Sequence, residues 1–427
     1  MKLVNELFDF INKSPTALHT VEAVKNALIA EGFTQVYENN TESFSDGGKH
    51  FVIRGGSSII AFKGGSNKGG FMITASHSDS PCFKVKAEMG GPIYSRLATE
   101  KYGGMIYYTW LDRPLSVAGR VVVKTDDGVK SKLVNIKNHS LVIPSVAIHL
   151  NRGVNESCKF NPAVDLLPLE GICCEDGKLM NLIAESATVS VGDIISHDLY
   201  LYNAEEGRRI GISDELILAP RIDDLGCVYA SLKAFTEAPE SDESVAVLAV
   251  FDNEEVGSET KQGAASTFLD MTLKAVAGTE SKYGDMLYNS FMVSADNAHA
   301  LHPNHPELYD KTNAPVLGGG VVVKYNANQR YTTDAVSDAV FSTLADRSGI
   351  RLQRYSNRAD MVGGSTLGSI SNTVVSISTI DIGLPQLAMH SATETAAVSD
   401  LADMVKVLYQ VYSSHIVKDG DEVKILK

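Results

Sequence analysis

Side chains that bind divalent metals lie just beyond predicted strands and at one predicted helix start. In chain order they are His77, Asp223, Glu255, Asp296 and His390. In open α/β sheets, functional groups collect beyond the carboxyl ends of the strands. Zinc is bound by histidine nitrogens and carboxylate oxygens at about 2.0–2.2 Å, and a catalytic site keeps one position for water. These residue types in these places predict a catalytic metal site.

The set is large enough for two metal ions. Two cations about 3.5–4 Å apart need a bridging carboxylate, and together they polarise one hydroxide. One acidic residue can bridge, which leaves each metal with one histidine and one further carboxylate. Glu254 is then spare, and a spare carboxylate beside a metal-bound water is what a general base requires. Such ligands accept Zn²⁺, Co²⁺ or Mn²⁺, and we expect Zn²⁺ first.

Asp79 is expected to orient His77. The two residues lie two positions apart, so in an extended segment both side chains project to the same side. Asp79 can then accept the far imidazole N–H of His77, which fixes its tautomer and raises its basicity.

Taken singly, each acidic residue also has a purely structural interpretation. Asp223 before a helix is most often an N-cap, and Asp296 can be a turn residue. The pair Glu254 and Glu255 is commonly a solvated loop or the first turn of a helix. Only the occurrence of the whole set, at strand ends and at one helix start, favours the metal site.

The composition describes an acidic chain of about two domains. Its 427 residues carry 38 Lys and Arg against 52 Asp and Glu, a net charge of −14. Nucleic-acid binders and anionic-membrane binders have a basic footprint that this chain lacks. No apolar run approaches the ~18 residues that span a bilayer, and the N-terminus has no signal-peptide block. We therefore expect a cytoplasmic protein with neither nucleic-acid nor membrane partners.

Strands and helices alternate over most of the chain. Buried strands are predicted over 58–62, 71–75, 245–251, 291–295, 321–325 and 374–380. Helices are predicted over 3–11, 17–28, 225–236 and 400–413. This alternation implies an α/β sandwich.

Residues 86–216 have a different pattern. Strand-like pieces over 117–124, 132–136 and 189–202 alternate with turns, and no long helix is expected there. No Pro- or Ser-rich tether flanks this stretch. We interpret it as a β-rich insertion in one α/β domain formed by 1–85 and 217–427.

Six motifs stand at the predicted site. They are SHSDSP (76–81), RIDDL (221–225), DNEEVGS (252–258), SADNAHA (294–300), KYNANQRY (324–331) and LPQLAMHS (384–391). Together they resemble the aspartyl aminopeptidase family of dinuclear zinc metalloaminopeptidases, which is related to vacuolar aminopeptidase I. The resemblance covers nearly the whole chain, including AIHLNR (147–152). It implies a three-layer α/β/α zinc-peptidase domain with a mixed central sheet, and a β-rich inserted dimerisation domain.

The resemblance also implies which metal each ligand holds. His77 and Asp296 are similar to the ligands of one metal, and Glu255 and His390 to those of the other. Asp223 is similar to the bridging carboxylate, and its peptide bond to the next residue is expected to be cis.

The remaining site residues take their roles from the same resemblance. Glu254 resembles the general base and acid, and Asp79 the residue that orients the first histidine. Lys324 matches a substrate-binding lysine near the pocket for the first side chain, where it would favour N-terminal Asp or Glu. The alternative is a surface lysine at a strand end. The loose fit of residues 358–366 to the family pattern keeps neutral N-terminal residues open.

The family forms dimers that assemble into a tetrahedral dodecamer. His149 matches a residue that reaches the active site of the neighbouring protomer, and an ordinary interface histidine is the alternative.

The resulting hypothesis is a metalloaminopeptidase that releases the N-terminal residue of peptides by means of a dinuclear, metal-bridged hydroxide. A metal-dependent deacylase of N-acyl amino acids on the same scaffold would share all the metal residues. A non-catalytic oligomeric scaffold that merely binds structural ions is the third alternative.

Overall fold

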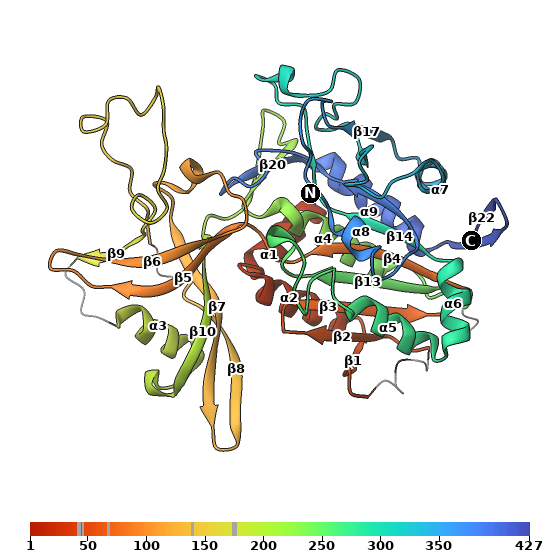
Figure 1. Cartoon of the computed structure of the whole chain (residues 1–427), viewed down its shortest axis with the longest axis horizontal. Coiled ribbons are helices and arrows are strands. Elements are labelled where there is room, and N and C mark those ends of the chain that lie inside the picture. The colour runs from red at the N-terminus through yellow and green to blue at the C-terminus, as the bar shows by residue number, and fades with distance from the viewer. Residues whose placement is uncertain (41–43, 45–46, 66–68, 138–140, 173–176) are drawn as a thin grey trace. The chain divides into compact units, whose positions relative to one another are not determined.

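The computed structural model describes residues 1–40, 44, 47–65, 69–137, 141–172 and 177–427 (Figure 1). The chain divides into two compact units. The first comprises 1–79, 208–389 and 394–427, and the second comprises 80–207 and 390–393. The insertion predicted from sequence spanned 86–216. The second unit starts earlier because β5 (Cys82–Met89) follows β4 (Phe71–His77) closely and pairs with strands of the insertion.

A mixed sheet forms the centre of the first unit, as expected. Among the described residues its strand order is β1-β2-β3-β13-β4-β14-β18-β16-β17. Besides β4, the strands are β1 (Thr34–Gln35), β2 (His50–Arg54), β3 (Ser58–Gly64), β13 (Val245–Phe251), β14 (Phe291–Ala295), β16 (Val321–Tyr325), β17 (Leu352–Ser356) and β18 (Ser378–Gly383). The central strands β13, β4, β14 and β18 run parallel to one another. Strand β3 is antiparallel to its neighbour β13, and β16 is antiparallel to its neighbour β18.

Both faces of the central strands are covered. Every residue of β13, β4 and β14 is buried. Parallel strands that are buried on both faces read as continuous apolar runs, which explains why β13, β14 and β16 have the bounds predicted from sequence.

One predicted strand is displaced. The apolar run 374–380 was expected to be a strand, but β18 begins at Ser378, and the preceding residues form a turn after α8 (Leu367–Ser371). The side chain of Asn372 accepts a hydrogen bond from Ile377 N at 3.1 Å and holds this turn. Val375 and Ile377 are buried in the core all the same. Periodicity alone cannot separate a short apolar strand from a buried turn.

Helices pack on the two faces of the sheet and complete three layers. On one face lie α1 (Lys2–Lys13), α2 (Ala17–Ala30), α4 (Ile222–Glu237), α7 (Ala335–Ser348) and α9 (Val398–Tyr412). On the other lie α5 (Phe268–Ala277), α6 (Glu280–Tyr288) and α8 (Figure 1). None of the helices in the described residues is long and apolar enough to cross a bilayer.

A smaller sheet of the first unit carries residues that flank the predicted site. Among the described residues its order is β11-β12-β20-β19-β15. These strands are β11 (Arg208–Ile210), β12 (Leu216–Ala219), β15 (Ala298–His299), β19 (Pro385–Leu387) and β20 (Glu394–Ala397). The C-terminal hairpin consists of β21 (His415–Asp419) and β22 (Glu422–Leu426).

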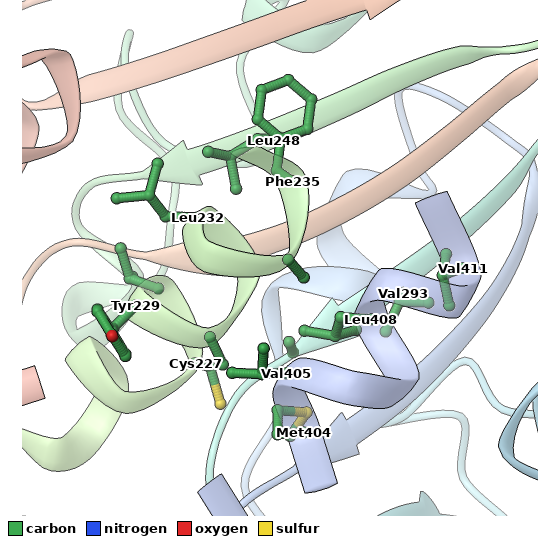
Figure 2. Packing of buried hydrophobic residues seen from close by; sticks show 14 of the residues in the cluster. Cys227, Tyr229, Leu232, Phe235, Leu248, Val293, Met404, Val405, Leu408 and Val411 are labelled. Atoms are coloured by element: carbon green, nitrogen blue, oxygen red, sulfur yellow. The ribbon is translucent and has the colours of Figure 1, made fainter. Parts of the chain in front are cut away.

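Helices α4 and α9 pack against each other over the central strands (Figure 2). Phe235 of α4 and Leu408 of α9 are fully buried, next to Leu248 of β13 and Val293 of β14. Burial of one such side chain contributes roughly 1.5–3 kcal/mol. This packing holds α4, and the start of α4 carries Asp223.

The second unit is built on an antiparallel sheet. Its order among the described residues is β8-β7-β10-β5-β6-β9. Besides β5, the strands are β6 (Tyr94–Tyr102), β7 (Leu115–Thr125), β8 (Gly128–Asn135), β9 (Leu169–Ile172) and β10 (Ile194–Asn203). Its core includes Phe83, Trp110, Val117 and Leu199. The rings of Phe83 and Trp110 pack edge to face, with their centroids 5.2 Å apart.

The sequence predicted no long helix in the insertion, and it gave no sign of the short helix that the second unit contains. Helix α3 (Lys178–Ala187) packs its apolar side, including Leu179 and Ile183, into the core of the second unit. At ten residues it is short, and a pattern of this length is ambiguous between a helix and a strand.

Replacing Leu408 by alanine should lower the free energy of unfolding by roughly 2–5 kcal/mol, because it leaves a cavity between α4 and α9. Urea denaturation followed by circular dichroism measures the change. Leu426→Ala on β22, where the side chain is 43% exposed, is the matched control and should cost less than about 0.5 kcal/mol. Equal losses in both variants would contradict tight packing at this position.

Candidate metal centre

The parallel register brings three strand ends to one edge of the sheet. His77 ends β4 and is paired in register with Phe251, the last residue of β13. Ser294 of β14 is paired with Ala75, so Asp296 leaves the sheet at the level of His77, two residues further on in both strands. Glu254 and Glu255 follow β13 in a 3-10 turn, η4 (Glu254–Val256).

Asp223 reaches this edge from the start of α4. The peptide bond between Asp223 and Asp224 is cis, as the family resemblance implied. Asp223 N donates to the Glu394 carboxylate at 2.9 Å, and Ile222 O accepts from the Asn297 side chain at 2.8 Å. Two side chains from distant segments therefore hold the backbone around Asp223.

The spacing around His77 is that of ligands sharing a cation. Its Nε2 atom lies 3.4 Å from Asp223 Oδ1 and 3.7 Å from Asp296 Oδ1. These separations exceed the usual 2.7–3.2 Å of a hydrogen bond. Two atoms each about 2.1 Å from a tetrahedral metal lie roughly 3.4 Å apart.

Other carboxylates extend the cluster. The ligand atoms of His77, Asp223, Asp224 and Asp296 all lie within 4.8 Å of one another, and those of His77, Glu254 and Glu255 do so as well. The first four residues are at most 9% exposed. Hard carboxylate oxygens and an imidazole in a buried cluster are a donor set that fits zinc.

The carboxylates perturb one another strongly. Burial raises the pKa of Asp224 well above its usual value, and the charges of Asp296 and Asp223 raise it further. Burial also raises the pKa of Glu254, with the charges of Asp296 and Glu255 adding to the effect. Bound cations balance such a concentration of negative charge.

The pKa values of His77 and Asp296 are shifted by the same group of buried charges. Burial by itself lowers the pKa of His77, but the charge of Asp224 and the other nearby carboxylates raise it well above its usual value. Burial raises the pKa of Asp296, yet the charge of Lys324 and the contact with His77 hold it well below the usual range.

Asp79 contacts His77 and also fixes the glutamate turn. His77 Nδ1 lies 3.1 Å from the main-chain oxygen of Asp79 and 3.4 Å from its carboxylate. The two carboxylate oxygens accept from Glu254 N at 3.1 Å and Glu255 N at 3.2 Å. Sequence reasoning expected the Asp79 carboxylate to accept from the imidazole, whereas the nearer acceptor is the main-chain oxygen. It did not anticipate that this carboxylate positions both glutamates.

Lys324 lies inside the cluster and not at the surface. Its side chain is 3% exposed, and Nζ donates to Asp296 Oδ2 at 3.2 Å. The ammonium also lies 5.5 Å from the centroid of the Tyr331 ring. Burial lowers the pKa of Lys324, but the charge of Asp296 outweighs it and raises the pKa above its usual value.

Two predicted residues belong to the second unit. His149 is exposed in a turn. His390 begins the segment 390–393 and has a positive φ of 65°, a conformation that is uncommon outside glycine. Its chain neighbour Met389 is the last residue of the first unit before this segment.

Sequence reasoning missed two supporting residues. Glu394 accepts from Asp223 N, and Asn297 donates both to Ile222 O and to Gln386 Oε1, the latter at 3.0 Å. Asn297 follows Asp296 directly, which was the one available signal. Nothing in the spacing of Glu394 indicated its contact with Asp223.

Comparisons with known proteins match nearly the whole chain. A sequence model of the family described as aminopeptidase I zinc metalloprotease (M18) matches residues 10–412. A Clostridium acetobutylicum protein named probable M18 family aminopeptidase 2 is 42% identical over 429 residues, covering 97% of this chain and 99% of that protein.

Solved structures match over the same extent. A chain in the cryo-EM structure of the Ape4 and Nbr1 complex is 34% identical, with a TM-score of 0.92, covering 96% of this chain and 85% of that one. The S. cerevisiae mApe1 dodecamer structure is 28% identical, with a TM-score of 0.81, covering 96% and 97%. Since family and relatives extend over nearly all of its length, the chain belongs to the M18 family of aminopeptidase I zinc metalloproteases.

Proposed function

We propose that this chain removes the N-terminal residue from peptides at a site for two metal ions, with Zn²⁺ as the first candidate and Co²⁺ or Mn²⁺ as alternatives. The observation that carries the proposal is the pair of 3.4 Å and 3.7 Å separations from His77 Nε2 to the Asp223 and Asp296 oxygens. Family membership supports peptide cleavage over deacylation or a scaffold role. A cytoplasmic location remains a prediction from sequence.

We assign the ligands as the sequence suggested. His77 and Asp296 would hold one ion, Glu255 and His390 the other, and Asp223 both. Chain continuity supports the place of His390. The chain leaves the first unit after Met389 and returns to it at Glu394. The Glu394 carboxylate accepts a hydrogen bond from Asp223 N at 2.9 Å. A segment of only four residues thus connects His390 to a side chain that contacts the bridging residue.

Glu254 is the proposed general base and acid. When bound, a pair of divalent cations would polarise the scissile carbonyl and make the attacking water more acidic. The Glu254 carboxylate takes the proton of that water and passes it to the leaving amine. The Asp79 carboxylate accepts a hydrogen bond from Glu254 N at 3.1 Å, and this bond fixes the backbone of the residue that moves the proton.

The Glu254→Gln variant should keep its metal and lose on the order of 10²–10⁴-fold in kcat, because the amide cannot carry the proton. Elemental analysis and a peptide-hydrolysis assay measure the two properties. Glu259→Gln replaces an exposed glutamate of the same loop and should change neither. Turnover retained by the Glu254 variant would remove the base assignment.

The preferred N-terminal residue depends on Lys324. An ammonium has three donors, and one of them is directed at Asp296 Oδ2. The remaining donors support recognition of an acidic side chain, whereas the pairing with Asp296 supports a neutral one. We propose N-terminal Asp or Glu as the first candidate.

A panel of aminoacyl chromogenic amides should therefore give the highest kcat/KM with Asp and Glu. The physical reason is the attraction between the buried ammonium of Lys324 and the substrate carboxylate. Leu and Ala derivatives are the matched neutral substrates. Faster hydrolysis of the neutral compounds would contradict the role of Lys324 in substrate recognition and leave only its contact with Asp296.

We propose further that the second unit mediates dimerisation and that dimers assemble into a tetrahedral dodecamer. The support is the dodecamer named for S. cerevisiae mApe1. His149 lies exposed in a turn of the second unit, where a neighbouring protomer can be reached.

His149→Ala should lower kcat while the assembly stays intact, because the imidazole would complete the site of a neighbouring protomer. Light scattering reports the assembly and the amide assay reports kcat. His305→Ala, an exposed histidine of the first unit, is the control. If the His149→Ala variant assembles and keeps full activity, the catalytic role of His149 is wrong and an ordinary interface histidine is the remaining interpretation.

A further inference from the structure

A pocket with a volume of about 750 Å³ lies in the first unit beside the glutamate turn. Its lining residues come from segments 326–330 and 359–370, together with Gly257. Gly257 N donates to Glu254 O at 2.9 Å, so this wall is part of the turn that carries the proposed base. The pocket therefore adjoins the turn that carries the proposed base.

The charge of the pocket is set by Arg330. This arginine is exposed and lines the pocket, and within the described residues it has no ion-pair partner. Asp360, the acidic residue of the lining, is already paired: its oxygens accept from Arg358 Nε at 2.6 Å and Nη2 at 2.8 Å. An unpaired guanidinium is suited to bind a carboxylate through two parallel hydrogen bonds.

The buried carboxylate of Asp381 accepts hydrogen bonds from residues in or next to the two lining segments, 326–330 and 359–370, which form the two walls of the pocket. Asp381 Oδ2 accepts from both the backbone N and the hydroxyl of Thr332 at 2.6 Å, two residues from Arg330. Asp381 Oδ1 accepts from the Thr366 hydroxyl at 2.6 Å, next to the lining residue Ser365. Asp381 is fully buried on a central strand, so the two walls are tied to the sheet.

We propose that this pocket binds the part of the substrate downstream of the cleaved bond, with Arg330 as the partner of a peptide carboxylate and Asp381 as a positioning residue. The inference rests on the proposed function. An extended chain advances by about 3.3–3.6 Å per residue, so the C-terminal carboxylate of a dipeptide or tripeptide lies only one or two such steps beyond the cleaved bond, a length that a pocket of about 750 Å³ can hold.

The test compares three substrates with the same N-terminal residue: a dipeptide, its C-terminal amide, and the aminoacyl nitroanilide. Arg330→Gln should raise KM for the free-acid dipeptide about tenfold and leave kcat unchanged, since a charged hydrogen-bond partner is lost. KM for the amide and the nitroanilide should stay unchanged. Arg351→Gln, an exposed arginine outside the lining, is the control and should alter none of them.

Equal effects of Arg330→Gln on acid and amide, or no effect on either, would overturn the inference while leaving the proposed function standing. A wild-type protein that cleaves none of the three substrates would instead overturn the proposed function.

A second pair of variants tests the positioning role. Asp381→Asn should raise KM for the dipeptide with its metal content unchanged, because an amide cannot accept all the hydrogen bonds from both walls. Asp400→Asn is the matched control: Asp400 is also fully buried and accepts from two backbone amides, Gly318 N at 2.8 Å and Gly320 N at 3.0 Å. KM unchanged in a folded Asp381 variant, or raised equally in both, would overturn this role. If the Asp381 variant does not fold, Arg330→Gln decides the proposal.

Discussion

Buried carboxylates that repel one another dominate the electrostatics of the candidate metal centre. Asp223, Asp224 and Asp296 bring ligand atoms within 4.8 Å of one another and of His77, at positions that are almost closed to water. Ionised groups in such a place need protons or cations to balance them. The raised pKa of Asp224 and the raised pKa of His77 are two responses to this one field.

Hydrogen bonds from the backbone and from a neutral side chain hold the segments around these carboxylates in place. Asp79 accepts from the backbone of both glutamates, and Glu394 accepts from Asp223 N. Asn297 joins the start of α4 to β19 through Ile222 O and Gln386. Each of these contacts links segments that lie far apart in the chain, so the site requires the complete first unit.

Three residues in or next to the candidate site have a strained backbone conformation. Arg221, Asn253 and His390 have positive φ values of 56°, 66° and 65°. Such conformations persist only where the surrounding structure over-determines them, and they cluster at functional sites. Here they occur within two residues of Asp223, immediately before Glu254, and at a proposed ligand.

Much of the first unit was predictable because its central strands are apolar throughout. The bounds of β13, β14 and β16 followed from their runs of Val, Ala and Phe, and the site followed from the polar residues just beyond them. The turn over 374–377 and helix α3 were not predictable. Their apolar residues are buried by tertiary contacts, and a short apolar pattern does not say which backbone shape buries it.

The donor types, their order and the strands that they follow could be read from the amino-acid sequence. The burial of Lys324 against Asp296, the contact of Glu394 with Asp223 and the hydrogen bonds of Asp381 to two pocket walls became visible only in the folded chain. The reason is physical. A hydrophobic pattern is local and can be read along the chain, whereas the partner of a buried polar atom is whichever distant group the packed sheet brings within about 3 Å.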